Sequence, residues 1–329
     1  MTSVDMHSHY YGGLVDDLRL RTARPFVSSD AQGRPVLNAM TASTVMTAGY
    51  VDLPARLAFM DQAGIDTQLL TFPGALGLDV MPVAEVGQAI RDFNDHLAAI
   101  CRASSGRFIG LAGLPLADLA QASNELRRAR HELGLLGAIL PGNFFLSIAK
   151  AEELRPVFAA ANDVKALLLI HPGLAPGEAP PESYDDTSVY RASALQLQAS
   201  LSHMGLTLLF GKLLDDYPDV TVQLVNLGGT LPFIIERLEA IALSRPPHEP
   251  FPREKLRRLY YDFASLGPRA LETAVRVIGA DRIMLGTDYP IFAPGDVLET
   301  ITAAQISAEE RDRVRSGTAR ALLTRLNGG

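Results

Sequence analysis

The sequence predicts a single domain, residues 1–329, folded as a (β/α)8 barrel. Short apolar, β-branched runs recur along the chain with helical patterns between them, as expected for repeated βα units and a parallel sheet. Eight such runs favour a closed TIM barrel over an open doubly wound sheet. The length and the hydrophobic content of 47% suit one large core, and barrels commonly fill this length as one domain.

The expected strands are short, and several of them end at a polar residue or a turn. They cover residues 4–9, 67–72, 108–112, 137–141, 166–171, 220–227, 259–263 and 282–288. A helix is expected over 54–64, because Pro54 suits a first helical turn and Gly64 a helix end. Similar apolar periodicity predicts helices over 83–103, 118–133 and 149–161.

Two segments depart from this alternation of strands and helices. Within 24–38, two short apolar runs flank a polar turn, which predicts a small β-hairpin inserted after strand 1. Residues 173–188, rich in Pro, Gly and Glu, follow the strand that ends at His171. We expect this segment to border the active face, although a surface loop without function is an equal alternative.

The composition argues against several classes of function. A net charge of -7 and the lack of a Lys/Arg cluster give no electrostatic basis for binding nucleic acid or an anionic membrane. The single cysteine, Cys101, excludes an internal disulfide framework and a Cys-rich metal site. No signal peptide or apolar run of about 18 residues is evident, so we expect a cytoplasmic protein that acts on small molecules.

Three strand ends carry residues that can bind a metal. His7 and His9 point to the same face of the first strand, because side chains at i and i+2 share a face. His171 ends the fifth strand and Asp288 the eighth. In such a barrel the C-terminal strand ends meet at one mouth, so the sequence predicts a site with three histidines and one carboxylate.

This ligand set suits one divalent ion, most simply Zn²⁺, with Mn²⁺ as an alternative and one position left open. The competing interpretation treats His7 and His171 as hydrogen-bonded core residues and Asp288 as a helix cap. Asp5 lies on the same face and is expected to support a ligand indirectly.

Six segments together resemble one known family. The chain is similar to the amidohydrolase-related family typified by 2-amino-3-carboxymuconate-6-semialdehyde decarboxylase, a branch of the amidohydrolase superfamily that includes several nonoxidative decarboxylases. The resemblance implies a barrel with one divalent ion on His7, His9, His171 and Asp288. It rests on residues 4–9, 56–65, 107–115, 170–172, 228–233 and 285–290.

The resemblance also implies functional roles for two arginines. It implies that Arg56 binds a carboxylate of the substrate, and that Arg237 reaches the active site of a neighbouring subunit, so that a homodimer is expected. Without the resemblance, both would be read as solvated charges on helix faces.

One position departs from the family pattern. Relatives usually carry a histidine before the Gly-Gly pair at the end of strand 6, where this chain has Asn226. An amide cannot transfer a proton at neutral pH, although it can hydrogen-bond a substrate oxygen. We therefore expect Asn226 to bind substrate rather than to activate water.

Three functions follow as hypotheses. We favour a metal-dependent decarboxylase of a small aromatic or unsaturated carboxylic acid, in which the substrate chelates the ion and Asp288 or water protonates the ring carbon. The alternative is a hydrolase in which the ion activates water toward an ester, lactone or amide. The third is a barrel that binds metal or acid without turnover.

Overall fold

Eight parallel strands form a closed barrel, as the sequence predicts. The computed structural model describes residues 3–40, 42–179, 190–292 and 294–328. The strands pair in the orders β1-β5-β6 and β7-β8-β9-β10-β11. Their bounds are β1 Val4–His9, β5 Thr67–Thr71, β6 Phe108–Leu111, β7 Gly137–Pro141, β8 Leu167–His171, β9 Thr221–Leu224, β10 Tyr260–Asp262 and β11 Ile283–Met284.

Backbone contacts join the two sets of strands into a ring. On one side Ala112 bridges to Ala138, which links β6 to β7. On the other side Ser8 bridges to Tyr289, and the Met6 N–H donates to the Leu285 carbonyl at 2.8 Å. Among the described residues, each of the eight strands therefore has a neighbour on both sides, which is the arrangement of a (β/α)8 barrel.

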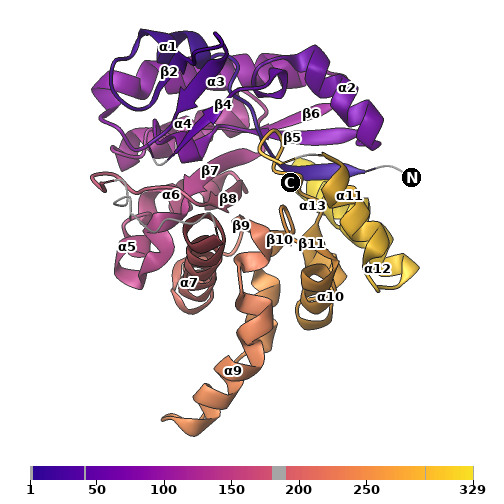
Figure 1. Ribbon diagram of the computed structural model, residues 1–329. Helices are drawn as coiled ribbons and strands as arrows, with labels where there is room; N and C mark the ends of the chain where they lie inside the picture. The colour runs from indigo at the N-terminus through magenta and orange to yellow at the C-terminus, as the bar shows by residue number, and fades with distance from the viewer. Residues whose placement is uncertain (1–2, 41, 180–189, 293, 329) are drawn as a thin grey trace.

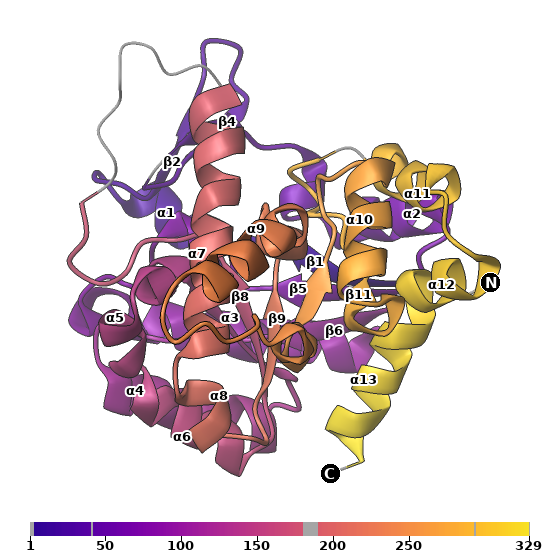
Figure 2. The ribbon, with the colours of Figure 1, turned by 90° about the horizontal axis from the view of Figure 1, so that it is seen from below.

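Helices surround the barrel in the two views (Figures 1 and 2). Three expected helices are confirmed as α2 Leu53–Ala63, α3 Val83–Ala103 and α4 Leu119–His131. The remaining α-helices are α1 Val15–Leu20, α5 Ile148–Glu152, α6 Arg155–Asp163, α7 Leu197–Phe210, α8 Leu213–Asp216, α9 Leu231–Ser244, α10 Pro268–Val277, α11 Pro294–Ala303, α12 Ala308–Asp312 and α13 Thr318–Asn327. None of the helices among the described residues is long and apolar enough to cross a membrane.

The helix expected over 149–161 is in fact two helices, α5 and α6. Pro156 lies in the first turn of α6. Because proline has no backbone N–H, it cannot extend the hydrogen-bond ladder of the preceding helix, but it suits a new first turn.

The insertion after β1 is larger than the expected hairpin. β2 Phe26–Ser29 and β3 Pro35–Asn38 pair in antiparallel register as predicted. A third strand, β4 Ser43–Val45, adds to β3. All three residues of β4 are exposed, so the sequence offers no buried face from which to predict it. Of the expected loop 173–188, residues 180–188 lie outside the described part of the chain.

Candidate metal centre

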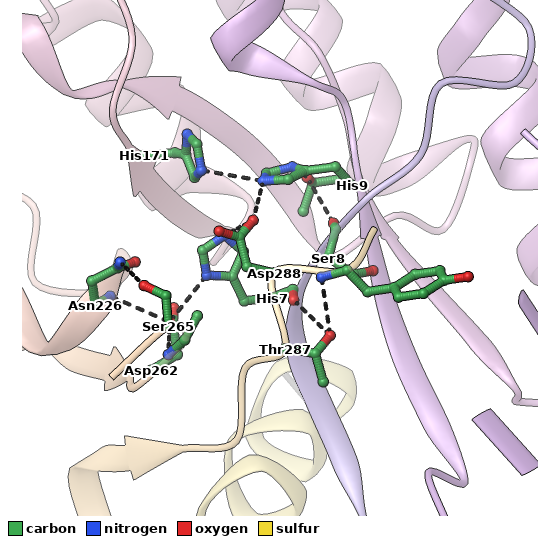
Figure 3. A network of polar contacts seen from close by, with 12 residues as sticks. His7, Ser8, His9, His171, Asn226, Asp262, Ser265, Thr287 and Asp288 are labelled. Atoms are coloured by element: carbon green, nitrogen blue, oxygen red, sulfur yellow. Dashed lines mark hydrogen bonds and ion pairs between the residues drawn. The ribbon is translucent and has the colours of Figure 1, made fainter. Parts of the chain in front are cut away.

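The structure brings the four predicted ligands together at the C-terminal mouth of the barrel (Figure 3). One ligand atom from each of His7, His9, His171 and Asp288 lies within 4.8 Å of the others. His9 Nε2 is 3.2 Å from His171 Nε2 and 3.2 Å from Asp288 Oδ1. His7 Nε2 is 3.6 Å from the same carboxylate oxygen. All four residues are buried.

The second ring nitrogen of each histidine has its own partner. His7 Nδ1 contacts Asp262 at 3.0 Å, His9 Nδ1 contacts the Thr71 hydroxyl at 2.9 Å, and His171 Nδ1 contacts the Pro172 carbonyl at 3.0 Å. Thr71 donates its own proton to the Ser8 carbonyl, so its oxygen accepts from His9. Each ring therefore carries its proton on Nδ1 and presents the Nε2 lone pair to the common centre.

A cation fits this arrangement. His7 Nε2 and Asp288 Oδ1 are buried without a hydrogen-bond partner among the described residues. Buried polar atoms are costly unless something pairs with them. Three imidazole nitrogens and one carboxylate oxygen are also the donor types that a divalent ion such as Zn²⁺ prefers.

The protonation of the cluster leads to the same conclusion. Burial lowers the pKa of His7, but the carboxylates of Asp262 and Asp288 outweigh burial and raise it to about 9. Burial, then His9 and His7, hold the pKa of His171 well below its usual value. Burial raises the pKa of Asp288, yet the three histidines bring it below its usual value. Without an ion, a proton on His7 supplies the positive charge that the cluster favours.

Two residues that the sequence analysis missed shape this centre. The Asp262 carboxylate, at the end of β10, also accepts from Gln223 Nε2 and from the backbone N–H groups of Asn226 and Ala264, so its position is fixed. At Gly286 a Cβ would stand 2.8 Å from the Cβ of His7 and 2.9 Å from that of Asp262. Only glycine leaves room for this pair. Asp262 is the last residue of β10 but the penultimate residue of the strand expected over 259–263, so a search for carboxylates near strand ends, and not only at the last residue, would have found it.

Asp5 and Arg56 belong to a buried network beneath the centre. Asp5 accepts from Gln68, from Thr287 and from the backbone N–H of His7. It therefore orders the backbone beside two ligands and does not touch a ligand ring. Gln68 in turn accepts from Arg56 at 2.8 Å.

The Arg56 guanidinium is fully buried. It donates to Ser8 and Gln68 and to the carbonyls of His9 and Gly49. Its Nε is buried and has no hydrogen-bond partner within the part of the chain that the structure describes. The structure thus places Arg56 directly behind His9, with most of its donors engaged inside the chain, and its expected contact with a substrate carboxylate stays a prediction.

Asn226 lies two residues after the end of β9, on the Asp262 side of the centre (Figure 3). Its amide donates to Ser265 at 3.0 Å, and its backbone has a φ of 52°, in the left-handed region that asparagine tolerates better than most residues. Arg237 lies apart from the cluster, exposed on α9, and the described chain does not bring it to its own site.

Comparisons with known proteins place this geometry in context. The amidohydrolase family model matches residues 4–325. The 2-amino-3-carboxymuconate-6-semialdehyde decarboxylase of Dictyostelium discoideum is 27% identical over 278 residues, which cover 82% of this chain and 75% of that protein. The gamma-resorcylate decarboxylase of Rhizobium sp. is 26% identical over 279 residues, covering 80% and 83%.

A solved structure shows the same fold. The dihydroxybenzoic acid decarboxylase of Polaromonas sp., with bound manganese and the inhibitor 2-nitroresorcinol, superposes with a TM-score of 0.74 at 21% identity. The match covers 99% of this chain and 97% of that one.

Proposed function

Because the chain belongs to the amidohydrolase family, we propose that it is a metal-dependent nonoxidative decarboxylase of a small aromatic or unsaturated carboxylic acid. One observation carries this proposal. Three Nε2 atoms and Asp288 Oδ1 converge while every Nδ1 is held by another partner. The curated relatives named above are decarboxylases.

When bound, a divalent ion supplies a Lewis acid that holds the substrate's carboxylate and a neighbouring oxygen. The reaction breaks the bond between the ring carbon and the carboxylate. The ring carbon first receives a proton; carbon dioxide then leaves, and the electron pair of the broken bond restores the unsaturated system. Asp288, whose carboxylate lies among the ligand atoms of the centre, is proposed to take this proton from water and to pass it to the ring carbon.

The other site residues bind and orient. Asn226 is proposed to hydrogen-bond a substrate oxygen, because an amide cannot move a proton. A phenolic acid that chelates the ion directly makes the smallest demand on a base at this position. Arg56 is proposed to fix the substrate's anionic group, which requires it to give up one of its present contacts or to use Nε.

For the ion itself, ligand chemistry favours Zn²⁺, and Mn²⁺ is the second candidate because the Polaromonas relative holds manganese. Reconstituting metal-free protein with each ion, and measuring turnover per bound ion, separates the two.

A substrate screen tests the function. Hydroxybenzoates and related acids are expected to release carbon dioxide in a reaction that chelators abolish, while lactones, esters and amides are left intact. Hydrolysis of a lactone or amide without release of carbon dioxide from any acid would replace the decarboxylase with the hydrolase.

We also propose a homodimer that α9 helps to form. In Figure 1 this helix extends away from the barrel at the lower edge of the view, and it exposes Phe233 (83%) and Leu243 (53%). Large apolar side chains exposed on a projecting helix are the kind of surface that a partner subunit covers. If Arg237 completes the partner's site, mixing Arg237→Ala subunits with Asp288→Asn subunits restores activity. If the mixed subunits remain inactive, Arg237 does not contribute to the active site of the partner subunit.

A further inference from the structure

Ser265 follows β10 at the C-terminal mouth of the barrel, beside the metal centre (Figure 3). Its Oγ accepts a hydrogen bond from the Asn226 side-chain amide at 3.0 Å. One carboxylate oxygen fixes the backbone around both residues, because Asp262 Oδ1 accepts from the N–H of Asn226 at 3.3 Å and from that of Ala264 at 3.2 Å. The same oxygen holds the ring of the ligand His7 at 3.0 Å. Asn226 and Ser265 are therefore tied to the centre through one shared acceptor.

The backbone of Ser265 has a conformation that serine rarely adopts. Its φ is 59°, while Asn226 and Asp288 at the two neighbouring strand ends have φ values of 52° and 55°. Asparagine and aspartate tolerate this left-handed region better than other residues that carry a side chain. Residues held in such conformations persist where the surrounding structure imposes them, and they cluster at functional sites. Ser265 thus shares an uncommon backbone geometry with two candidate site residues.

Two hydrogen-bonding groups of Asn226 and Ser265 are unused within the described part of the chain. A serine hydroxyl has one proton and can also accept, and the oxygen of a side-chain amide accepts. The Ser265 Oγ accepts from Asn226, but no described residue accepts the Ser265 proton. No described residue donates to Asn226 Oδ1 either. Since Ser265 is exposed and Asn226 is 5% exposed, the pair presents one donor and one acceptor at the mouth.

One donor beside one acceptor is complementary to a hydroxyl group, which accepts one hydrogen bond and donates another. A carboxylate oxygen only accepts, and an apolar substituent does neither. We propose that Asn226 and Ser265 bind a hydroxyl substituent of the substrate, which donates to Asn226 Oδ1 and accepts from the Ser265 hydroxyl. This inference rests on the decarboxylase proposed above and narrows its substrate to a phenolic acid with a ring hydroxyl besides the groups that chelate the ion. A site built for such a hydroxyl discriminates against analogues that lack it.

The test compares salicylate with its derivatives that carry a second ring hydroxyl, one for each open ring position. Calorimetry on the metal-loaded protein measures the Kd of each probe. At least one derivative is expected to bind about 10-fold more tightly than salicylate. Ser265→Ala and Ser265→Gly each remove one of the two proposed bonds and should lower this preference to about 3-fold or less. Glycine also suits the left-handed backbone, so agreement between the two variants separates loss of the hydroxyl from backbone strain.

The Kd of salicylate and the metal content are expected to stay unchanged in both Ser265 variants. Ser105→Ala is the matched control, because Ser105 is also exposed and left-handed, with a φ of 51°, but precedes β6 at the opposite end of the barrel. It should keep the full preference.

Equal Kd values for salicylate and every derivative in the unmodified protein would overturn the proposal, as would an undiminished preference in both Ser265 variants. An equal loss of affinity for salicylate and the preferred derivative would also overturn it, because a merely structural role predicts that result. Release of carbon dioxide tests the decarboxylase separately. If the preference is present and depends on Ser265 while no acid releases carbon dioxide, the hydroxyl-binding pair is supported and the decarboxylase fails.

Discussion

At the scale of single residues, the centre depends on the groups that orient its ligands as much as on the ligands themselves. Asp262 holds the His7 ring at 3.0 Å and fixes which nitrogen faces the ion. Partners of this kind set both the tautomer and the basicity of a ligating histidine.

We therefore expect Asp262→Asn to weaken metal affinity by about 10- to 100-fold with all four ligands still present. Competition with a chelator of known affinity measures the change. Asp281→Asn serves as the control, since Asp281 pairs with Arg257 at the periphery. An affinity that Asp262→Asn leaves unchanged would mean that the ring is oriented by packing alone.

Asn226 and Asp288 are expected to differ sharply when each is changed. If Asn226 only orients substrate, Asn226→Ala costs about one hydrogen bond, ~0.5 to 1.5 kcal/mol in kcat/KM. Asp288→Asn removes both a ligand and the proposed proton carrier and should leave almost no turnover. Steady-state kinetics on one acid compares the two variants directly.

Asn226→His returns the residue type of the relatives to this position, whose left-handed backbone histidine also tolerates. Under the decarboxylase hypothesis this change brings little gain. A large gain in activity, with a new ionisation near neutral pH, would instead favour a water-activating hydrolase.

At the scale of elements, the sequence predicts the parts that carry strong local patterns. All eight strands, the helices α2, α3 and α4 and the four clustered ligands follow from apolar runs and strand-end residues. β4 could not be predicted, because its three exposed residues have no buried face. The break between α5 and α6 depends on one proline. The hydrogen bonds that hold Arg56 inside the chain could not be predicted either, because some of their acceptors, such as Ser8 and His9, are distant in sequence.

The turn after β11 gives a test at this scale. Gly286→Ala introduces a Cβ within 3 Å of His7 and Asp262, so it should separate this pair and lower metal affinity at least about 10-fold. Gly267→Ala is the control, since no heavy atom lies within 4 Å of the Cβ it would add. Equal metal affinity in the two variants would show that a Cβ at position 286 is accommodated without displacing the His7 or Asp262 side chain.

The loop after β5 carries a buried acid, Asp79, whose two oxygens have no partner among the described residues. Burial raises its pKa to about 8, against about 3.9 for an exposed aspartate. Between these values the folded protein keeps a proton that the unfolded chain releases. The free energy of unfolding therefore falls as pH rises through this window, by up to ~1.4 kcal/mol per pH unit.

Asp79→Asn removes this dependence, so the variant should gain stability relative to the unmodified protein as pH rises from 5 to 8. Urea unfolding at several pH values measures the difference, with the exposed Asp163→Asn as a control for net charge. A difference that stays flat or falls with pH would contradict the assignment.

At the scale of the whole molecule, the barrel brings residues 7, 9, 171 and 288 from opposite ends of the chain to one mouth. The ring of strands closes where β1 meets the segment that follows β11. His7 and Asp288 are held there by one backbone bond, from the Asp288 N–H to the His7 carbonyl at 2.8 Å. The contacts that close the barrel thus also hold His7 and Asp288 together, although the two ligands lie at opposite ends of the sequence.

The central claim is that one divalent ion on these four residues is required for decarboxylation. Titrating metal-free protein with Zn²⁺ or Mn²⁺, while recording bound ion and carbon dioxide released from the best acid, tests it most directly. We expect activity to rise linearly and to saturate at about one ion per chain, and His7→Ala/His171→Ala to stay folded without ion or activity. Full activity in the metal-free protein, or one tightly held ion in the folded double variant, would contradict the account.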